Sequence, residues 1–373
     1  MFRLSNLIKS TLQEQKSRSL DGSIIIWNMT NRCNLLCHHC YSKASANEKE
    51  SLSLEDILKT IPKLKIANIN FVIFSGGEPL LRKDIFEIAQ CMKDNKIMTY
   101  LSTNGTYITQ KNAQKIIDTF NYIGISIDGI GEVHDYFRGQ KGSYDKSIEA
   151  IKTIQKKGGN AGIRFTITKE TESSFYDIFT LAEELNVNKI YISHLVYSGR
   201  GKENLEIDIS KEKRREYVNF MINKAFEYYE NGKDIDIVTG NMEMDAIMLL
   251  KEFEKKYPDF VNSLKNRLKF WGGNSAGKRL GNMDWNGFVK PDPFFPMTIG
   301  NYLEKDFDKI WLDDSNELLK KLREFPRNIK GKCSSCKYID ICNGGSRSRA
   351  YAISGDLWDE DPSCYLTLEE IKG

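Results

Sequence analysis

Short apolar segments alternate with amphipathic helical stretches over the first half of the chain. Runs rich in Ile, Val, Phe and Tyr are typical of buried strands, and apolar residues three and four apart are typical of helices that cover a sheet. The pattern predicts strands over residues 23–27, 70–74, 98–102, 122–127, 162–168 and 189–194. It predicts helices over residues 53–65, 84–94, 110–119, 144–157 and 175–185. Repeated βα units in this register imply an α/β fold with a parallel sheet closed into most of a barrel.

The alternation stops after His194. Two helical stretches, over residues 211–231 and 242–270, lead to a glycine-rich region of short elements. We therefore expect four parts. They are an N-terminal extension that starts as a short amphipathic helix (1–22), a partial barrel (23–210), a helical connection (211–270) and a separate C-terminal domain (271–373).

Three cysteines lie in one short loop directly after the first predicted strand. Cys33, Cys37 and Cys40 are separated by three and then two residues. Thiolates on such a loop can hold three irons of a [4Fe–4S] cluster and leave the fourth iron open to an outside ligand. Zinc is the alternative, but it would need a fourth ligand. His38 and His39 lie between Cys37 and Cys40 and are poorly placed to supply it.

Three later strands also end in polar residues. The segments are Ser75-Gly-Gly-Glu-Pro79, Ser102-Thr-Asn-Gly105 and Ser126-Ile-Asp-Gly129. The chemistry of (β/α) barrels lies at the C-terminal ends of the strands, where all these segments fall. Glycines allow a close approach of backbone to a ligand, and Glu78 can accept a hydrogen bond from an ammonium group.

The four motifs, in this order, resemble those of the radical S-adenosylmethionine (SAM) enzymes. The resemblance implies a partial (β/α)6 TIM-type barrel and a catalytic cluster on Cys33, Cys37 and Cys40, with SAM bound to the open iron. It implies that Glu78 receives the SAM ammonium, that Ser126 or Arg164 meets the carboxylate, and that Asn104 reaches the ribose. The residues that it places at the cofactor are Tyr41, Gly76, Gly77, Glu78, Asn104, Ser126, Asp128, Arg164 and Leu195.

A second thiol set lies near the C-terminus, at Cys333, Cys336, Cys342 and Cys364. Taken alone, its spacing would suit a zinc ribbon equally well. After a radical SAM barrel it resembles the SPASM/twitch type of C-terminal domain, which implies one auxiliary [4Fe–4S] cluster on these four residues. The positions expected for a second auxiliary cluster carry other residues, at Asn274, Asp292 and Ser346. Cys91 lies within a predicted helix and is expected to be a small buried hydrophobe.

The segments 194–201, 271–277 and 340–350 narrow the resemblance to the tetrapyrrole-modifying branch, which includes enzymes of haem d1 and alternative haem biosynthesis. The resemblance implies a siroheme-derived ring whose acetate or propionate side chains are removed or trimmed. A polycarboxylate favours arginine partners, since guanidinium groups bind carboxylates through two parallel hydrogen bonds. The substrate candidates are His194, Arg200 and Arg347, with Arg279 and Arg349 also expected near the mouth. The alternatives are solvated surface charges for the arginines and a hydrogen-bonded structural role for His194.

Composition agrees with such an enzyme. The net charge of +3 comes from 54 basic and 51 acidic residues that are interspersed, which gives no support to a nucleic-acid or membrane role. No apolar run approaches the roughly 20 residues of a transmembrane helix. The apolar core of the N-terminal segment is too short for a secretory signal. Eight cysteines without a signal indicate metal ligation in a reducing cytoplasm. Reductive SAM cleavage also implies a small electron donor such as a ferredoxin or flavodoxin.

Two other functions compete with this hypothesis. Many SPASM-type enzymes are maturases of ribosomally made peptides, but those that bind a leader peptide commonly carry an additional N-terminal domain, and only 22 residues precede the first strand. A redox or metal-carrying structural protein that cleaves no SAM would leave Gly76, Gly77, Glu78 and Asn104 without a purpose.

Overall fold

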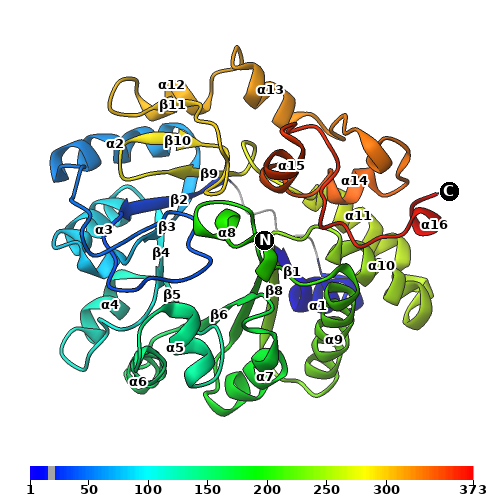
Figure 1. The fold of residues 1–373 in the computed structure, drawn as a ribbon, viewed down its shortest axis with the longest axis horizontal. Coiled ribbons are helices and arrows are strands. Elements are labelled where there is room, and N and C mark those ends of the chain that lie inside the picture. The colour runs from blue at the N-terminus through cyan, green and yellow to red at the C-terminus, as the bar shows by residue number, and fades with distance from the viewer. Residues whose placement is uncertain (16–21, 373) are drawn as a thin grey trace.

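The computed structural model describes residues 1–15 and 22–372, which form one curved sheet surrounded by helices (Figure 1). The sheet has 11 strands in the order β1-β8-β7-β6-β5-β4-β3-β2-β9-β10-β11. Strands β2 to β8 pair in parallel. Their bounds are Ser23–Thr30, Ile69–Gly76, Met98–Thr103, Tyr122–Ser126, Ala161–Ile167, Lys189–His194 and Asp236–Gly240.

Helices on the outside of the sheet cover its apolar face (Figure 1). They are α2 (Leu54–Ile66), α3 (Ile85–Asp94), α4 (Ala113–Thr119), α6 (Ser143–Lys156), α7 (Phe175–Glu184) and α9 (Lys211–Glu230). Helix α2 starts where the sequence predicts, because the Asp56 N–H donates to the Ser53 hydroxyl at 3.1 Å. Its Ile57 and Ile61 are fully buried, and each such side chain contributes about 1.5–3 kcal/mol.

The inner face of the sheet is more polar. Along β7 every second residue is only half-buried, which is the two-residue period of a strand with two different faces, and β5 and β6 follow the same period except at the buried Gly124 and Gly162. Side chains stack across this lumen: the Lys189 ammonium lies 4.2 Å from the Tyr122 ring, and the Arg164 guanidinium lies 4.6 Å from the Tyr191 ring. The lumen therefore offers cations and hydroxyls below the strand ends.

The structure extends the barrel beyond the six predicted strands. Strand β8 follows β7 in parallel, so the alternation continues after His194, which the sequence pattern did not indicate. Strand β1 (Phe2–Arg3) pairs antiparallel with β8, and α1 (Leu4–Leu12) packs on β8 and α9. Residues 16–21 of the expected N-terminal extension, and residue 373 of the expected C-terminal domain, lie outside the described residues.

The C-terminal region continues the same sheet. Strand β9 (Leu280–Met283) pairs in parallel with β2, and β10 (Phe288–Lys290) and β11 (Gly300–Asn301) follow as antiparallel neighbours. This region is therefore joined to the barrel edge through backbone hydrogen bonds.

The helical stretch expected over 242–270 is divided in the structure. It consists of α10 (Asp245–Lys256) and α11 (Val261–Trp271), separated by a 3-10 turn at Pro258–Phe260, because proline cannot continue the hydrogen bonding of the preceding helix. Helix α5 (Glu132–Arg138) was not predicted. The remaining helices are α8 (Arg200–Glu203), α12 (Phe307–Trp311), α13 (Glu317–Arg323), α14 (Ile339–Cys342), α15 (Arg347–Ser354) and α16 (Leu368–Ile371).

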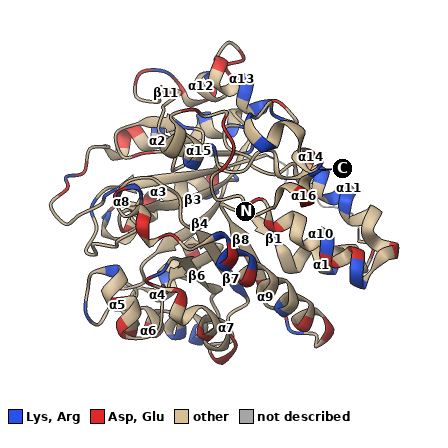
Figure 2. Ribbon diagram, turned by 45° about the vertical axis from the view of Figure 1, so that its right-hand side comes forward, with Lys and Arg blue, Asp and Glu red and all other residues tan. Residues whose placement is uncertain are grey.

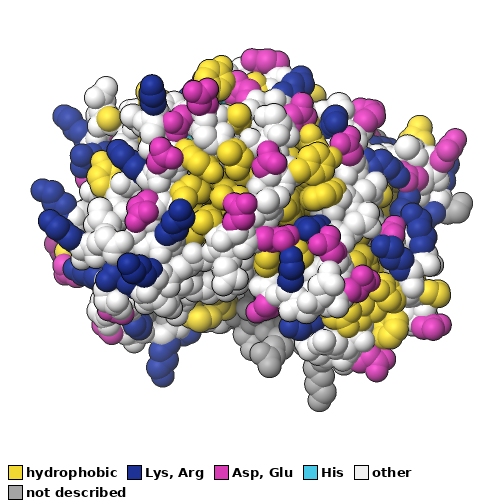
Figure 3. Space-filling view, turned by 90° about the horizontal axis from the view of Figure 1, so that it is seen from below, with side chains coloured by type: hydrophobic (Ala, Val, Ile, Leu, Met, Phe, Trp, Pro, Cys, Tyr) yellow, Lys and Arg dark blue, Asp and Glu magenta, His cyan; other side chains and the backbone are white. Residues whose placement is uncertain are grey.

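Charged side chains of both signs are interspersed over the helices (Figure 2). On the face seen from below, basic and acidic residues surround apolar side chains without forming one large patch of a single sign (Figure 3). Among the described residues, no helix is both long and apolar enough to span a bilayer.

Candidate active site at the C-terminal ends of the strands

The first cysteine loop leaves the end of β2 and folds over the barrel mouth. Its backbone is held where the Cys33 N–H donates to the Ser45 carbonyl at 3.0 Å. Cys33 and Cys37 are buried and Cys40 is half-buried, and the three pack together with Leu35 and Ala44. Burial raises the pKa of Cys33 to about 12 and also raises the pKa of Cys37, so these two thiols need an electropositive partner to act as thiolates.

The glycine pair at the end of β3, Gly76 and Gly77, packs against the start of this loop. The Gly77 N–H donates to the Thr30 carbonyl, and the Glu78 N–H to the Arg32 carbonyl, both at 2.8 Å. A Cβ atom on Gly77 would lie 2.1 Å from the Arg32 oxygen, and one on Gly76 would lie 2.3 Å from the Thr30 oxygen. The close approach that these glycines permit is therefore to the start of the cysteine loop, whereas the sequence suggested a ligand.

Glu78 has a different environment from the one expected. Its side chain is fully buried, and its oxygens accept hydrogen bonds from the Thr103 hydroxyl and the Asn104 N–H, both at 2.8 Å. Burial raises the pKa of Glu78. A buried carboxylate requires such donors, and here they join β3 to the end of β4. In this structure the carboxylate is not open to an ammonium group.

Asp128 also differs from its expected role at the cofactor. It is fully buried, accepts a hydrogen bond from the Thr166 N–H at 2.6 Å, and forms an ion pair with Arg138 of α5. Its own N–H donates to Nδ1 of His134 at 3.0 Å. Asp128 therefore connects β5, β6 and α5, and all three partners lie outside the Ser126–Gly129 motif.

The other expected cofactor residues lie around the lumen. The Tyr41 hydroxyl donates to Oδ1 of Asn28 at 2.8 Å, and the Asn104 amide donates to Oδ1 of Asn34 at 3.0 Å. Ser126 and Arg164 are register partners on β5 and β6, and both are half-buried. Within residues 1–15 and 22–372, Arg164 forms no ion pair, and its guanidinium lies over the Tyr191 ring.

Leu195, the last of the expected cofactor residues, forms a hydrogen bond through its backbone carbonyl. Its side chain is buried, and its carbonyl accepts a hydrogen bond from Nη1 of Arg349 at 3.1 Å. The carbonyl is thus already paired within the protein.

Arg200 supports the cysteine loop, which differs from the expected substrate contact. Its Nε donates to the Cys37 carbonyl at 2.8 Å, and its Nη1 donates to the Ala44 carbonyl at 3.2 Å. Its backbone N–H donates to the Cys40 carbonyl at 3.0 Å. The guanidinium thus holds the loop in place instead of pointing to an open mouth.

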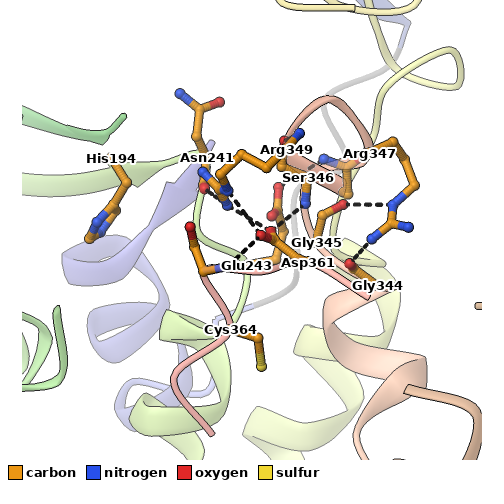
Figure 4. Close-up of polar contacts among 12 residues, drawn as sticks. His194, Asn241, Glu243, Gly344, Gly345, Ser346, Arg347, Arg349, Asp361 and Cys364 are labelled. Carbon is orange, nitrogen blue, oxygen red and sulfur yellow. Dashed lines mark hydrogen bonds and ion pairs between the residues drawn. The ribbon is translucent and has the colours of Figure 1, made fainter. Parts of the chain in front are cut away.

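Figure 4 shows Arg347 and His194, the other two residues expected to contact the substrate. Both side chains are buried. The Arg347 guanidinium donates to the carbonyls of Leu357 at 2.8 Å and Gly344, in an irregular loop. His194 accepts from Nη1 of Arg214 at 3.2 Å, and burial lowers the pKa of His194. Neither side chain is open to a substrate in this structure.

The other two arginines expected near the mouth are likewise engaged. Arg279 donates to the Trp271 carbonyl at 2.8 Å, and Arg349 forms a buried ion pair with Asp361. An arginine side chain has five N–H donors, so it can satisfy several buried acceptors at once. The sequence cannot distinguish such an arginine from one that awaits a ligand.

The second thiol set lies on three short segments. Cys333 is within the 3-10 turn Gly331–Ser335 and Cys336 follows it directly, Cys342 ends α14, and Cys364 precedes α16. Burial raises the pKa of Cys333 to about 12, and the charges of Cys364 and Cys336 contribute further to the increase. Cys336 is the half-buried member.

In the part of the chain that the structure describes, no three His, Cys, Asp or Glu side chains converge as ligands of a single metal ion. Cys thiolates are the donors that hold [4Fe–4S] clusters, each thiolate binding a different iron. Both sets therefore supply the type of donor that such a cluster requires.

The positions expected for a second auxiliary cluster hold a hydrogen-bonded network. The Asn274 amide donates to Oε1 of Glu243 at 3.1 Å, and Nη1 of Arg327 donates to Oδ1 of Asn274 at 3.0 Å. Asp292 is buried nearby, and Ser346 caps α15 by accepting from the Arg349 N–H at 3.3 Å. Glu243 and Arg327 complete this network, and no motif in the sequence marks either residue.

Sequence reasoning also missed Arg138. Its Nη1 lies 3.6 Å from the sulfur of Cys37, inside the barrel mouth. The available signal was the segment His134-Asp-Tyr-Phe-Arg138-Gly139, whose glycine ends α5 with a left-handed backbone. The contact joins residues 101 positions apart.

Comparison with known proteins shows the family. The model of the Radical SAM superfamily matches residues 27–182. The chain is 36% identical to pre-heme d1 synthase of Dinoroseobacter shibae, over 99% of this chain and 93% of the relative. It is 37% identical to Fe-coproporphyrin III synthase of Methanosarcina barkeri, over 93% of this chain and 89% of the relative.

The chain also has a more distant relative and a similar solved structure. The chain is 28% identical to the mycofactocin maturase MftC of Mycolicibacterium smegmatis, over 95% of this chain and 85% of the relative. Its fold is similar to that of SuiB of Streptococcus suis bound to S-adenosylmethionine, with a TM-score of 0.72 at 17% identity, over 92% of this chain and 77% of the neighbour.

Proposed function

The chain belongs to the radical SAM superfamily and is an enzyme that uses SAM, and we propose that it removes or trims carboxylate side chains of a siroheme-derived tetrapyrrole. The observation that carries the proposal is the extent of the two haem-related matches. Both exceed 35% identity, and each spans more than nine-tenths of this chain. The maturase match is weaker, at 28%.

We assign the radical cluster to Cys33, Cys37 and Cys40. These residues would hold a [4Fe–4S] cluster, which would supply one electron for the cleavage of SAM to methionine and a 5′-deoxyadenosyl radical. The chain's own residues then have to hold SAM and the target C–H in one geometry and exclude competing reactants. The position of Arg164 beside Ser126, without an ion pair among the described residues, supports a contact to the SAM carboxylate, and Asn104 is assigned to the ribose.

We assign one auxiliary [4Fe–4S] cluster to Cys333, Cys336, Cys342 and Cys364, fully ligated by the protein. Its role is to take up the electron left after side chain loss or to bind substrate. The domain division 23–210, 211–270 and 271–373 belongs to the same proposal, as do a ferredoxin or flavodoxin donor and a cytoplasmic location, which the eight free cysteines support.

The test is product analysis under anaerobic conditions. The reconstituted enzyme is incubated with SAM, dithionite and didecarboxysiroheme, and mass spectrometry follows 5′-deoxyadenosine and the tetrapyrrole. We expect 5′-deoxyadenosine together with a tetrapyrrole that has lost carboxylate-bearing fragments. The variant with Cys33, Cys37 and Cys40 replaced by Ala is the control and should yield neither product. SAM cleavage with an unaltered tetrapyrrole would refute the substrate and favour a maturase.

A further inference from the structure

We propose that Arg138 is a positioning residue that raises the reduction potential of the radical cluster through its contact with the Cys37 sulfur, and that Asp128 limits this effect. The inference rests on the proposed function, because it requires a cluster at Cys33, Cys37 and Cys40. Arg138 uses two nitrogens: Nη1 lies 3.6 Å from the Cys37 sulfur, and Nη2 forms an ion pair with Asp128.

The backbone of α5 fixes this contact. The Leu36 N–H donates to the Arg138 carbonyl at 3.2 Å, and the His38 N–H donates to the Phe137 carbonyl at 3.0 Å. These bonds flank Cys37 on both sides, so the loop is seated on the C-terminal end of the helix. A Cβ atom on Gly139 would lie 3.0 Å from the Leu36 oxygen, so the loop and the end of the helix are closely packed.

The Arg138 charge acts in a protected environment. Arg138, Asp128 and Cys37 are 8%, 0% and 7% exposed. Electrostatic interactions are stronger in such an interior than in water, and solvent screens them less. A cation next to a cluster thiolate in this interior therefore has a strong electrostatic effect on the cluster.

The other titratable groups around Arg138 do not duplicate its role. His39 stacks on Phe137 with ring centroids 4.7 Å apart, and burial lowers the pKa of His39 to about 4. Burial also lowers the pKa of His134 to about 4. Both rings are therefore neutral near pH 7. His38 pairs with Glu170 at 2.7 Å, and the Arg200 guanidinium donates to backbone carbonyls instead of a sulfur.

The sign of the effect follows from charge. Reduction adds one electron to the cluster and makes it more negative. A cation that donates a hydrogen bond to a ligating sulfur stabilises the reduced state more than the oxidised state, so the potential rises. The Asp128 carboxylate holds the guanidinium in place and offsets part of its charge, so the two residues act in opposite directions.

The test is an anaerobic redox titration followed by electron paramagnetic resonance. The radical cluster signal is defined as the signal missing from the variant with Cys33, Cys37 and Cys40 replaced by Ala. In Arg138→Gln, we expect the reduction equilibrium to shift at least tenfold toward the oxidised cluster, which is 59 mV for one electron. Arg138→Lys, which keeps the charge, should stay within threefold of the unmodified protein. Asp128→Asn should shift the equilibrium toward the reduced cluster.

The outcomes separate this inference from the proposed function. Equal potentials in the unmodified protein, Arg138→Gln and Asp128→Asn, at equal iron content, would refute the inference alone. A shift of Arg138→Lys as large as that of Arg138→Gln would refute it as well, because loop disturbance would then explain both. If Arg138→Gln does not retain the cluster, the direction of the Asp128→Asn shift decides. A radical cluster signal that is absent even from the unmodified protein would refute the proposed function.

Discussion

Arg349 and Asp361 form a two-point ion pair in the protein interior. Nε and Nη2 of Arg349 lie 2.9 Å and 2.7 Å from the two carboxylate oxygens, and the side chains are 0% and 1% exposed. Arg349 also donates to the Leu195 and Asn241 carbonyls, just after β7 and β8. The pair therefore ties the ends of two barrel strands to the segment that leads into Cys364 (Figure 4).

Asp361→Asn should destabilise the protein by about 3–5 kcal/mol, because it leaves the Arg349 charge buried without its partner. Anaerobic chemical denaturation followed by circular dichroism measures the change. Asp356→Asn is the matched control, since the Lys330–Asp356 pair is 69% and 34% exposed, and such a pair is worth less than about 1 kcal/mol. Equal stabilities of the two variants would contradict the assigned role of Asp361.

A second prediction concerns Arg200. Arg200→Glu places a carboxylate against the carbonyls of Cys37 and Ala44, so it should displace the cysteine loop. We expect SAM cleavage without substrate to fall at least about tenfold, which corresponds to about 1.4 kcal/mol. Lys202→Glu changes the same charge at an exposed position of α8 and should leave cleavage unchanged. Weakened tetrapyrrole binding with normal SAM cleavage in Arg200→Glu would instead favour a direct substrate contact.

The barrel strands could be predicted from local sequence, because each is an apolar run with a clear end. Strand β8 was missed because its few residues lack such a run, and its position depends on pairing with β7. The cysteine loops have fixed spacings and are visible in sequence. The contacts of Arg138, Arg200 and Arg347 depend on segments distant in the chain, and a lone arginine carries no sign of its partner.

The network at Asn274 leads to a prediction about iron content. Amide, carboxylate and hydroxyl groups are poor replacements for thiolates at an iron–sulfur cluster, and Asn274 is already engaged with Glu243 and Arg327. The reconstituted protein should therefore contain about eight irons per chain, as two cubane clusters. Replacing Cys33, Cys37 and Cys40 by Ala should lower this to about four. A reproducible value of about twelve irons would contradict the prediction.

The last prediction concerns the pH dependence of stability at Asp292. Burial, with the nearby charge of Glu243 as a further cause, raises the pKa of the Asp292 carboxyl to about 6, compared with 3.8 for an ordinary Asp. Between these two values the folded state binds more protons than the unfolded chain. Stability from this group therefore falls as the pH rises from about 4 to about 6, and above that the penalty is complete, at about 3 kcal/mol.

Asp292→Asn removes this charge and keeps a side-chain oxygen to accept the Phe294 N–H, which lies at 2.8 Å. The variant should therefore gain stability relative to the unmodified protein between about pH 4.5 and pH 7.5, as measured by urea denaturation at both values. Asp135→Asn is the control: burial opposes ionisation of Asp135, but hydrogen bonds from Tyr144 and Gly142 outweigh it and lower the pKa of Asp135. A carboxyl group whose pKa is lowered by folding loses its contribution to stability only as the pH falls below the ordinary pKa of Asp. The effect of Asp135→Asn should therefore be similar at both pH values. A parallel pH dependence of Asp292→Asn and the unmodified protein would show that Asp292 is ionised without penalty in the folded state.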